Sequence, residues 1–161
     1  MISSIYDFFQ NINIITLENG VRLKLRIVKS TADIIPSPRA SGNIYIPCKI
    51  KHHLKNYYIK KVCSDAFNHN LNIKSIEFAH DSELQTIESN ALAGCSIDYI
   101  SIPSPFIDFG SNWYNPSLRK MNISITSPNN RFSYLDNEHK IILTKSNKDN
   151  DQFNSIFFVN R

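Results

Sequence analysis

The side chains able to do acid–base or nucleophilic chemistry are few, and their spacing matches no catalytic motif. Glu77, Glu83 and Glu88, together with five histidines, could transfer protons, and three cysteines could act as nucleophiles. The chain contains neither G-x-S-x-G nor H-E-x-x-H, and no cysteine and histidine share a recognised motif. We therefore predict a protein that is not an enzyme.

The sequence also predicts no metal and no cofactor. Cys48, Cys63 and Cys95 are odd in number, lie far apart and include no C-x-x-C pair, so neither a zinc site nor a disulfide framework is indicated. We expect free thiols that pack as small apolar side chains. The four glycines of the chain form no glycine-rich phosphate loop, which argues against nucleotide binding.

Five lysines and no acidic residue occupy residues 49–61, which makes this segment a candidate anion-binding loop. It could bind a sulfated glycan, an acidic protein or a phosphate-rich lipid. The alternative is a solvated loop whose lysines only keep an edge of the fold soluble. The two adjacent histidines lack further ligands at a metal-binding spacing. The candidate residues are Lys49, Lys51, His52, His53, Lys55, Lys60 and Lys61.

The net charge of +4 is unevenly distributed along the 161 residues. Residues 1–74 carry 11 basic and 4 acidic side chains, residues 75–118 carry six acids and no Lys or Arg, and residues 119–161 carry 7 basic and 4 acidic side chains. A nucleic-acid-binding protein usually keeps its positive charge along one continuous footprint. The acidic block interrupts that footprint, so we do not expect nucleic acid as the partner.

An internal repeat with a period of about two dozen amino acids predicts how these side chains are positioned. The pattern I-x-x-I-x-[FI] occurs at 73–78 and again at 97–102, with further echoes at 42–47 and 121–125. A second unit, in which Val62 precedes Ala66-Phe67, returns at a matching distance as Ile87 before Ala91-Leu92. Such a period indicates stacked coils, each adding one short strand to a parallel sheet. The alternative is an ordinary β-domain whose many isoleucines mimic a period.

Strand alternation then predicts which side chains face the core and which face solvent. The inward set is Ile44, Ile46, Ile76, Phe78, Ile100, Ile102, Ile123 and Ile125. The outward positions would form a row across the concave sheet, where exposed tyrosines could anchor a partner. Equally, tyrosine is common on sheet surfaces for purely structural reasons. The candidate binding residues on this face are Tyr45, Glu77, Tyr99, Ser101, Asn122 and Ser124.

With these residues in view, the chain resembles the BspA-like leucine-rich-repeat surface antigens of protists and bacteria. Residues 84–103 follow the family unit L-x-x-I-x-x-x-A-F-x-x-C-x-x-L-x-x-I-x-I-P closely, with Leu92 in place of the usual Phe. The preceding unit has Phe78-Ala79 in place of Ile-Pro, and the following one places Trp113-Tyr114 near the Ala-Phe position. The resemblance implies a mostly β or α/β leucine-rich-repeat solenoid with a parallel sheet on its concave face. It also implies a binding or adhesive surface.

The flanking segments predict caps for the repeats. Residues 12–27 read as a β-hairpin around Asn19-Gly20, with one basic face and one apolar face. Residues 30–41 read as an irregular connection, and residues 132–143 as a second hairpin. The predicted organisation is a capping segment at 1–41, about four repeats at 42–126 and a terminal unit at 127–161. The apolar strand at 155–161 could pair with a second copy of the chain.

We predict a non-catalytic recognition module that contacts a protein or an acidic glycan through the concave sheet. The competing hypothesis is an intracellular scaffold that associates with copies of itself through the terminal strand. The family resemblance favours a cell-surface or extracellular location. The absence of a visible signal peptide, and of any apolar run long enough to span a membrane, favours the cytoplasmic alternative.

Overall fold

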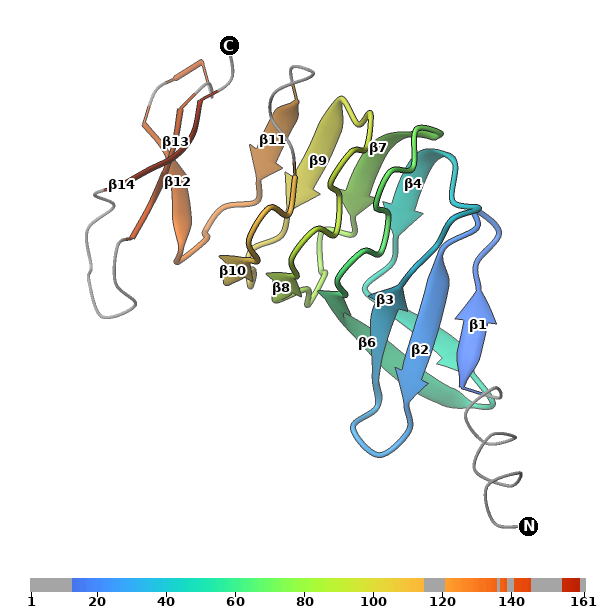
Figure 1. Ribbon diagram of the computed structural model, residues 1–161. Coiled ribbons are helices and arrows are strands. Elements are labelled where there is room, and N and C mark those ends of the chain that lie inside the picture. Colours follow the sequence, from blue (N-terminus) through green and yellow to red (C-terminus); the bar gives the residue numbers. More distant parts are fainter. Residues whose placement is uncertain (1–12, 115–120, 136, 139–140, 146–154, 160–161) are drawn as a thin grey trace.

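The computed structural model describes residues 13–114, 121–135, 137–138, 141–145 and 155–159. These residues form fourteen strands and contain no helix (Figure 1). The strands lie in three sheets, and a solenoid built from two of them occupies the middle of the molecule (Figure 1). The strands are β1 Ile14–Thr16, β2 Arg22–Arg26, β3 Thr31–Ile35, β4 Gly42–Ile46, β5 Lys49–His52, β6 Lys55–Val62, β7 Ile73–Phe78, β8 Thr86–Ile87, β9 Tyr99–Ile102, β10 Asp108–Phe109, β11 Asn122–Ile125, β12 Phe132–Tyr134, β13 Ile141–Thr144 and β14 Ser155–Val159.

A four-stranded parallel sheet, in the order β11-β9-β7-β4, carries the predicted isoleucine spine. Ile44 is the Cα partner of Ile76, Ile76 of Ile100, and Ile100 of Ile123. The spacing of the isoleucine pattern in the sequence is therefore the actual register of the sheet. The predicted repeat is confirmed.

A seven-stranded sheet, in the order β1-β2-β3-β6-β8-β10 with β5 added beside β6, lies across the core from the first. β1, β2 and β3 are antiparallel neighbours, whereas β3, β6, β8 and β10 are parallel. The expectation of an irregular connection at 30–41 is wrong, because residues 31–35 form β3. The strand is hard to recognise in sequence because its outward position holds a charged residue, Asp33, which is buried beside Arg26.

Each coil of the solenoid contains one strand from each of these two sheets. The four coils pair β3 with β4, β6 with β7, β8 with β9, and β10 with β11. A third ladder stacks the intervening turns, where Phe67 N–H donates to Ala91 O at 2.8 Å and Leu92 N–H donates to Trp113 O at 2.7 Å. The backbone is thus hydrogen-bonded from coil to coil on three sides.

A residue with a left-handed backbone conformation lies one or two positions before each of these turn residues. Asp65, Asn90 and Asn112 have φ values of 58°, 56° and 52°. Asn and Asp adopt this region more readily than other non-glycine residues, because their short polar side chains can hydrogen-bond locally. The Asp/Asn recurrence is a conformational signature of the repeat that the apolar pattern alone does not reveal.

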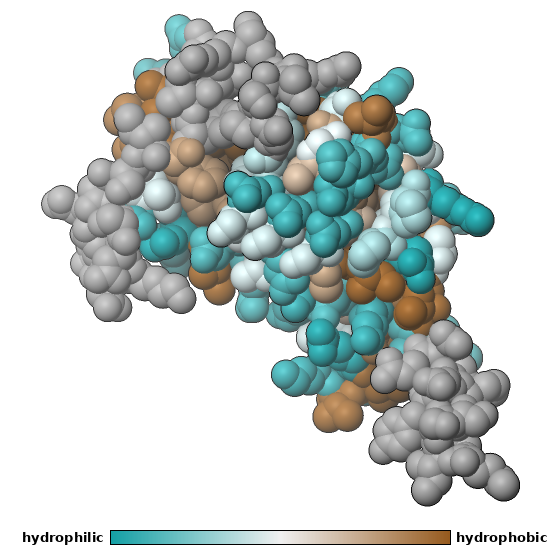
Figure 2. All heavy atoms as spheres, in the orientation of Figure 1, coloured by the Kyte–Doolittle hydropathy of each residue, from teal (hydrophilic) through white to brown (hydrophobic). Residues whose placement is uncertain are grey.

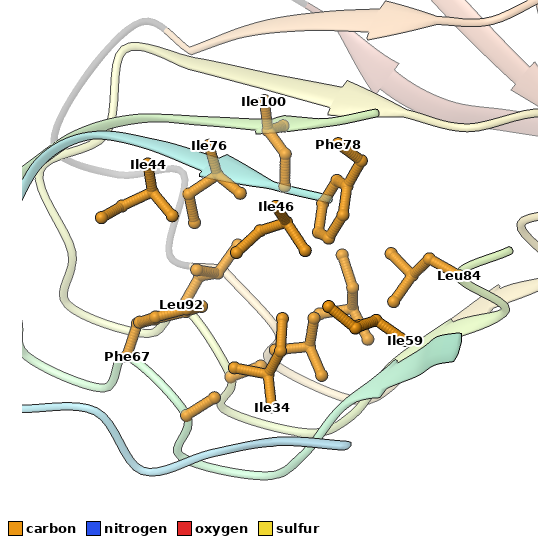
Figure 3. Close-up of a cluster of buried hydrophobic side chains, with 14 of the residues drawn as sticks. Ile34, Ile44, Ile46, Ile59, Phe67, Ile76, Phe78, Leu84, Leu92 and Ile100 are labelled. Atoms are coloured by element: carbon orange, nitrogen blue, oxygen red, sulfur yellow. The ribbon is translucent and has the colours of Figure 1, made fainter. Parts of the chain in front are cut away.

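The core fills the space between the two sheets. Figure 3 shows Ile44, Ile46 and Ile76 on one side, with Ile34 and Ile59 facing them from the seven-stranded sheet. All five are almost completely buried, and burying an isoleucine stabilises a fold by about 1.5–3 kcal/mol. The predicted inward residues are buried apart from Ile125, which is half-buried at the last strand.

Side chains from both flanking segments hydrogen-bond the edge strands of the four-stranded sheet. At one edge, Asn19 in the β1–β2 turn donates through Nδ2 to Tyr45 O at 3.2 Å. At the other edge, the Tyr134 hydroxyl donates to Ile123 O at 2.9 Å and accepts from Ile125 N–H at 2.8 Å. These contacts satisfy backbone groups that an open solenoid would leave unpaired. The predicted hairpins are present as β1–β2 and β12–β13.

The C-terminal cap is a three-stranded antiparallel sheet, β12-β13-β14, which lies beside β11 (Figure 1). It packs on the last coil through aromatic rings. The centre of the Phe109 ring of β10 lies 5.0 Å from that of Phe157 of β14, and 4.1 Å from that of Trp113. The predicted terminal strand, as far as Val159, is therefore β14 and pairs with β13. Self-association through this strand stays a prediction.

The repeat length, the parallel register and the stacked turns together make this part of the chain a leucine-rich-repeat solenoid of about four coils, as predicted.

Asn129 joins the C-terminal cap to the third coil, and its removal should be costly. Its Oδ1 accepts from Arg131 and Phe132 N–H at 2.8 Å, and its Nδ2 donates to Pro103 O and Ser104 O at 3.1 Å. We expect Asn129→Ala to lower the free energy of unfolding by about 2 kcal/mol, because backbone groups lose their partners. Urea unfolding measures this, and Asn130→Ala, at an exposed neighbour, is the control. Equal losses in the two variants would contradict the assignment.

Candidate functional site

The outer face of the four-stranded sheet aligns the predicted binding residues in two rows. In the first row, Ser75 is the Cα partner of Asn43 and Tyr99, and Tyr99 of Asn122. In the second row, Tyr45 is opposite Glu77, and Ser101 is opposite Ser124. Adjacent strands lie about 4.8 Å apart, so the first row is a regular line of side chains across the sheet. The second row consists of two separate pairs, because the β7–β9 ladder ends at Ile76 and Ile100.

This surface offers two tyrosines among hydrogen-bonding groups. Tyr45 is 55% exposed, Glu77 and Asn122 are exposed, and Tyr99 and Ser124 are half-buried. The Ser75 hydroxyl donates to Asn43 Oδ1 at 3.0 Å, which fixes one pair of polar side chains in place. A polar sheet surface that carries an exposed tyrosine ring is suited to recognition.

Ser101 does not belong to the exposed surface. It is only 8% exposed, and its hydroxyl accepts from Phe78 N–H at 2.7 Å. The β7–β9 ladder ends at Ile76 and Ile100, so the serine oxygen replaces the carbonyl that would otherwise receive that N–H. The exposure expected for Ser101 from strand alternation is wrong for this reason.

The lysine-rich segment is not a loop but a β-hairpin. β5 and β6 pair antiparallel from Lys49 and Tyr58 to His52 and Lys55, joined by a two-residue turn. β5 covers the first half of one edge of β6, and β8 covers the second half. The sequence conceals this hairpin because its turn, His53-Leu54, lacks the Asn-Gly or Gly residues that usually mark one.

Three of the five lysines in this hairpin already have partners within the fold. Lys60 forms an ion pair with Glu83, and Lys61 Nζ lies 2.9 Å from Glu88 Oε1. Lys55 Nζ donates to a backbone carbonyl at 2.6 Å. Both acids belong to the next coil of the chain. The predicted cluster of seven cationic and imidazole side chains is therefore not one free anion site.

Ion pairing shifts the pKa values of one of these pairs in opposite directions. The Lys61 hydrogen bond holds the pKa of Glu88 below its ordinary value, and backbone and side-chain donation from Ser64 adds to this. The same Glu88 bond raises the pKa of Lys61. Both groups therefore stay charged over a wider pH range than they would in water.

Lys49 and Lys51 remain on the outer face of the seven-stranded sheet. Lys49 Nζ lies 5.6 Å from the centre of the Tyr58 ring, a cation–π contact, and both lysines are exposed. The register places Arg26 of β2 in the same row as Tyr58 and Lys49, through Thr31 of β3. The two basic segments noted in the sequence thus share one face of one sheet.

The predictions about metal ligands and thiols concern His52, His53 and the three cysteines. The His52 and His53 rings meet edge to face at 4.1 Å, and within the described ranges no three His, Cys, Asp or Glu side chains gather as a metal site. Cys48, Cys63 and Cys95 are free thiols. Burial raises the pKa of Cys95 to about 11, and its Sγ donates to Phe67 O.

One polar hollow escapes the sequence analysis. Its volume is about 420 Å³, and it lies on the seven-stranded sheet beside the Lys61–Glu88 pair. Its lining includes residues from three consecutive coils, so no contiguous motif marks it. The polar lining residues are Ser64, Thr86, Glu88, Ser89 and Asp108.

No protein-family model matches the chain, and no curated protein matches it. Among solved structures it is similar to a leucine-rich-repeat protein from Bacteroides capillosus, with 12% identity and a TM-score of 0.46 over 70% of this chain and 98% of that one. It is similar to the pneumococcal vaccine antigen PcpA, with 19% identity and a TM-score of 0.46 over 73% of this chain and 39% of that one. A leucine-rich cell-surface protein from Faecalibacterium prausnitzii gives 13% identity and a TM-score of 0.32 over 83% of this chain and 58% of that one.

These likenesses are distant, and the assignment of the fold rests on the register of the coils themselves. The chain spans less than two thirds of PcpA and of the Faecalibacterium protein. The BspA-like family therefore remains a resemblance of sequence pattern. Among the residues whose positions are described, no helix is long and apolar enough to cross a membrane.

The Glu88–Lys61 pair should make stability depend on acid pH. Because the folded-state pKa of Glu88 is lowered, its contribution is present above the unfolded pKa of about 4.3 and is lost as pH falls through the folded value. Both side chains are partly exposed, so we expect Glu88→Gln to cost at most about 1 kcal/mol at pH 7 and almost nothing at pH 3. Urea unfolding at both pH values tests this. Glu77→Gln is the control, and a cost at Glu88 independent of pH would contradict the pairing.

Proposed function

We propose that the chain is a non-catalytic recognition module that binds a protein partner through the outer face of the four-stranded sheet. The observation that carries the proposal is the pair of rows of outward side chains held in register by the isoleucine spine, in which Tyr45 is 55% exposed. Tyrosine provides a large contact area with few rotatable bonds, so little conformational entropy is lost on binding.

The proposal gives the cationic outer face of the seven-stranded sheet a separate role. Lys49 and Lys51 lie on the outer face of the seven-stranded sheet, and the core separates the two sheets. They could raise the association rate of an acidic partner through long-range attraction, which is screened beyond about 8 Å at physiological salt. They would not form part of the same contact surface as Tyr45 and Tyr99.

The resemblance to surface antigens supports a cell-surface or extracellular site of action for this module. Brief treatment of intact cells with a protease distinguishes it from the cytoplasmic alternative. We expect the chain to be cleaved while a cytoplasmic marker protein survives. Protection of the chain until the cells are lysed would overturn this part of the proposal.

The binding face can be tested with a double substitution. We expect Tyr45→Ala with Tyr99→Ala to weaken binding to the partner by ten-fold or more, because aromatic anchors carry much of the binding energy of an interface. The measurement is biolayer interferometry against arrays of extracellular proteins and of sulfated and unsulfated glycans.

The matched control is Tyr58→Ala, which removes a half-buried tyrosine from the outer face of the other sheet. The proposal predicts that this variant binds as the wild type does. Binding that survives the double substitution contradicts the proposed face. Binding restricted to sulfated glycans and abolished by Lys49→Gln with Lys51→Gln would assign recognition to the lysine hairpin instead.

A further inference from the structure

Two turns of the seven-stranded sheet lie at the same end of that sheet, where β3 and β6 begin. The β2–β3 turn spans residues 27–30, and the β5–β6 turn spans residues 53–54. β3 and β6 are parallel neighbours, and each is joined by a turn to the antiparallel strand before it. Both turns therefore lie at the end of the sheet where β3 and β6 begin. Lys55 Nζ ties them together by donating to Ile27 O at 2.6 Å.

Large apolar side chains occupy these two turns without packing into the fold. Val28 is 98% exposed, Leu54 is 92% exposed and Ile27 is 49% exposed. Figure 2 shows apolar atoms at the lower end of the molecule, where Figure 1 places the β2–β3 turn. We call Ile27, Val28 and Leu54 the tip patch. Exposed apolar side chains that gather in this way mark interaction sites more often than single exposed residues do.

The backbone conformation at position 54 is also unfavourable for a leucine. His53 and Leu54 have φ values of 45° and 63°, the left-handed conformation that a two-residue hairpin turn requires. Asn and Gly adopt it readily, whereas a leucine is strained there. A leucine that is both strained and exposed contributes nothing to the core. Strained residues cluster at sites that contact a ligand, so this leucine indicates a contact with another molecule.

Positively charged side chains flank the tip patch along the chain. Arg26, Lys29 and Lys51 flank it in sequence, and all three are exposed. Asp33 is the one acidic residue between positions 21 and 62, and it is buried in an ion pair with Arg26 at 2.5 Å. Neither Lys29 nor Lys51 forms an ion pair among the described residues.

We propose that the tip patch inserts into the interfacial region of an anionic lipid membrane, with the surrounding cations contacting lipid headgroups. Apolar side chains that project from turns and are flanked by lysine and arginine match a bilayer interface in both polarity and charge. Interfacial binding of this kind strengthens with the apolar area buried and with attraction to anionic lipids. The end of the seven-stranded sheet that carries these turns would contact the membrane surface. This inference does not rest on the proposed protein-binding face.

The test uses the full chain and vesicles of two compositions, one of pure phosphatidylcholine and one in which phosphatidylserine is the minor component. We expect co-sedimentation with the phosphatidylserine-containing vesicles at low salt, weaker binding as salt rises, and little binding to pure phosphatidylcholine. Val28→Asn with Leu54→Asn should lower the partition coefficient by ten-fold or more. Lys29→Gln and Lys51→Gln should lower it about five-fold each.

Matched variants separate lipid contact from loss of fold. Asn adopts the left-handed conformation at position 54, so Leu54→Asn should leave the urea unfolding midpoint unchanged or raise it. Leu71→Asn changes another leucine, 69% exposed on a different turn, and Lys74→Gln changes an exposed lysine outside the patch. Neither should alter vesicle binding, and nor should the double substitution at Tyr45 and Tyr99.

Three results would overturn the proposal. The first is no binding to phosphatidylserine-containing vesicles at low salt. The second is equal binding by the wild type and by the variant with asparagine at both positions 28 and 54. The third is that the substitutions at positions 28 and 54 abolish binding to a protein partner and leave vesicle binding unchanged. The third result would identify the patch as part of a protein interface.

Discussion

The fold depends on isoleucines from successive coils packing directly above one another. A single coil has two short strands and cannot cover its own apolar side chains. Ile44, Ile76, Ile100 and Ile123 are in register, so each coil buries the face of the one before it. The same register fixes the outward residues in rows, because successive side chains of a strand point to opposite faces. The core and the proposed binding face are therefore two consequences of one alignment.

A stack of this kind has two ends, and each leaves strand backbone and apolar surface without a neighbouring coil. The chain closes both ends with side chains. Asn19 hydrogen-bonds the backbone of β4, the Tyr134 hydroxyl bridges two backbone groups of β11, and Phe109, Phe157 and their aromatic neighbours cover the last coil. These caps are specific to the ends, so they do not share the repeat pattern. They explain how so short a solenoid can keep its edge strands satisfied.

The sequence predicts the repeating part of the structure and the two flanking hairpins, and it misses β3 and the β5–β6 hairpin. Ile76, Ile100 and Ile123 align correctly because the period carries their register. β3 escapes recognition because its only charged residue, Asp33, is neutralised by Arg26 from a neighbouring strand. The β5–β6 hairpin resembles a loop in sequence because Leu54 stands where a turn residue is expected. The partners of Lys60 and Lys61 come from the next coil, and only the stacked structure brings them together.

The insertion of this hairpin shows what a solenoid can accommodate. Each coil contacts only its neighbours, so extra residues between β4 and β6 disturb neither the isoleucine spine nor the turn ladder. The hairpin instead extends the seven-stranded sheet at the end from which the β2–β3 turn already projects. Its tip adds strained and exposed Leu54 to exposed Val28, and its outer face adds two lysines that lack acidic partners among the described residues. An insertion that served only solubility would gain nothing from that leucine. The apolar tip is therefore the observation on which the proposed membrane contact rests.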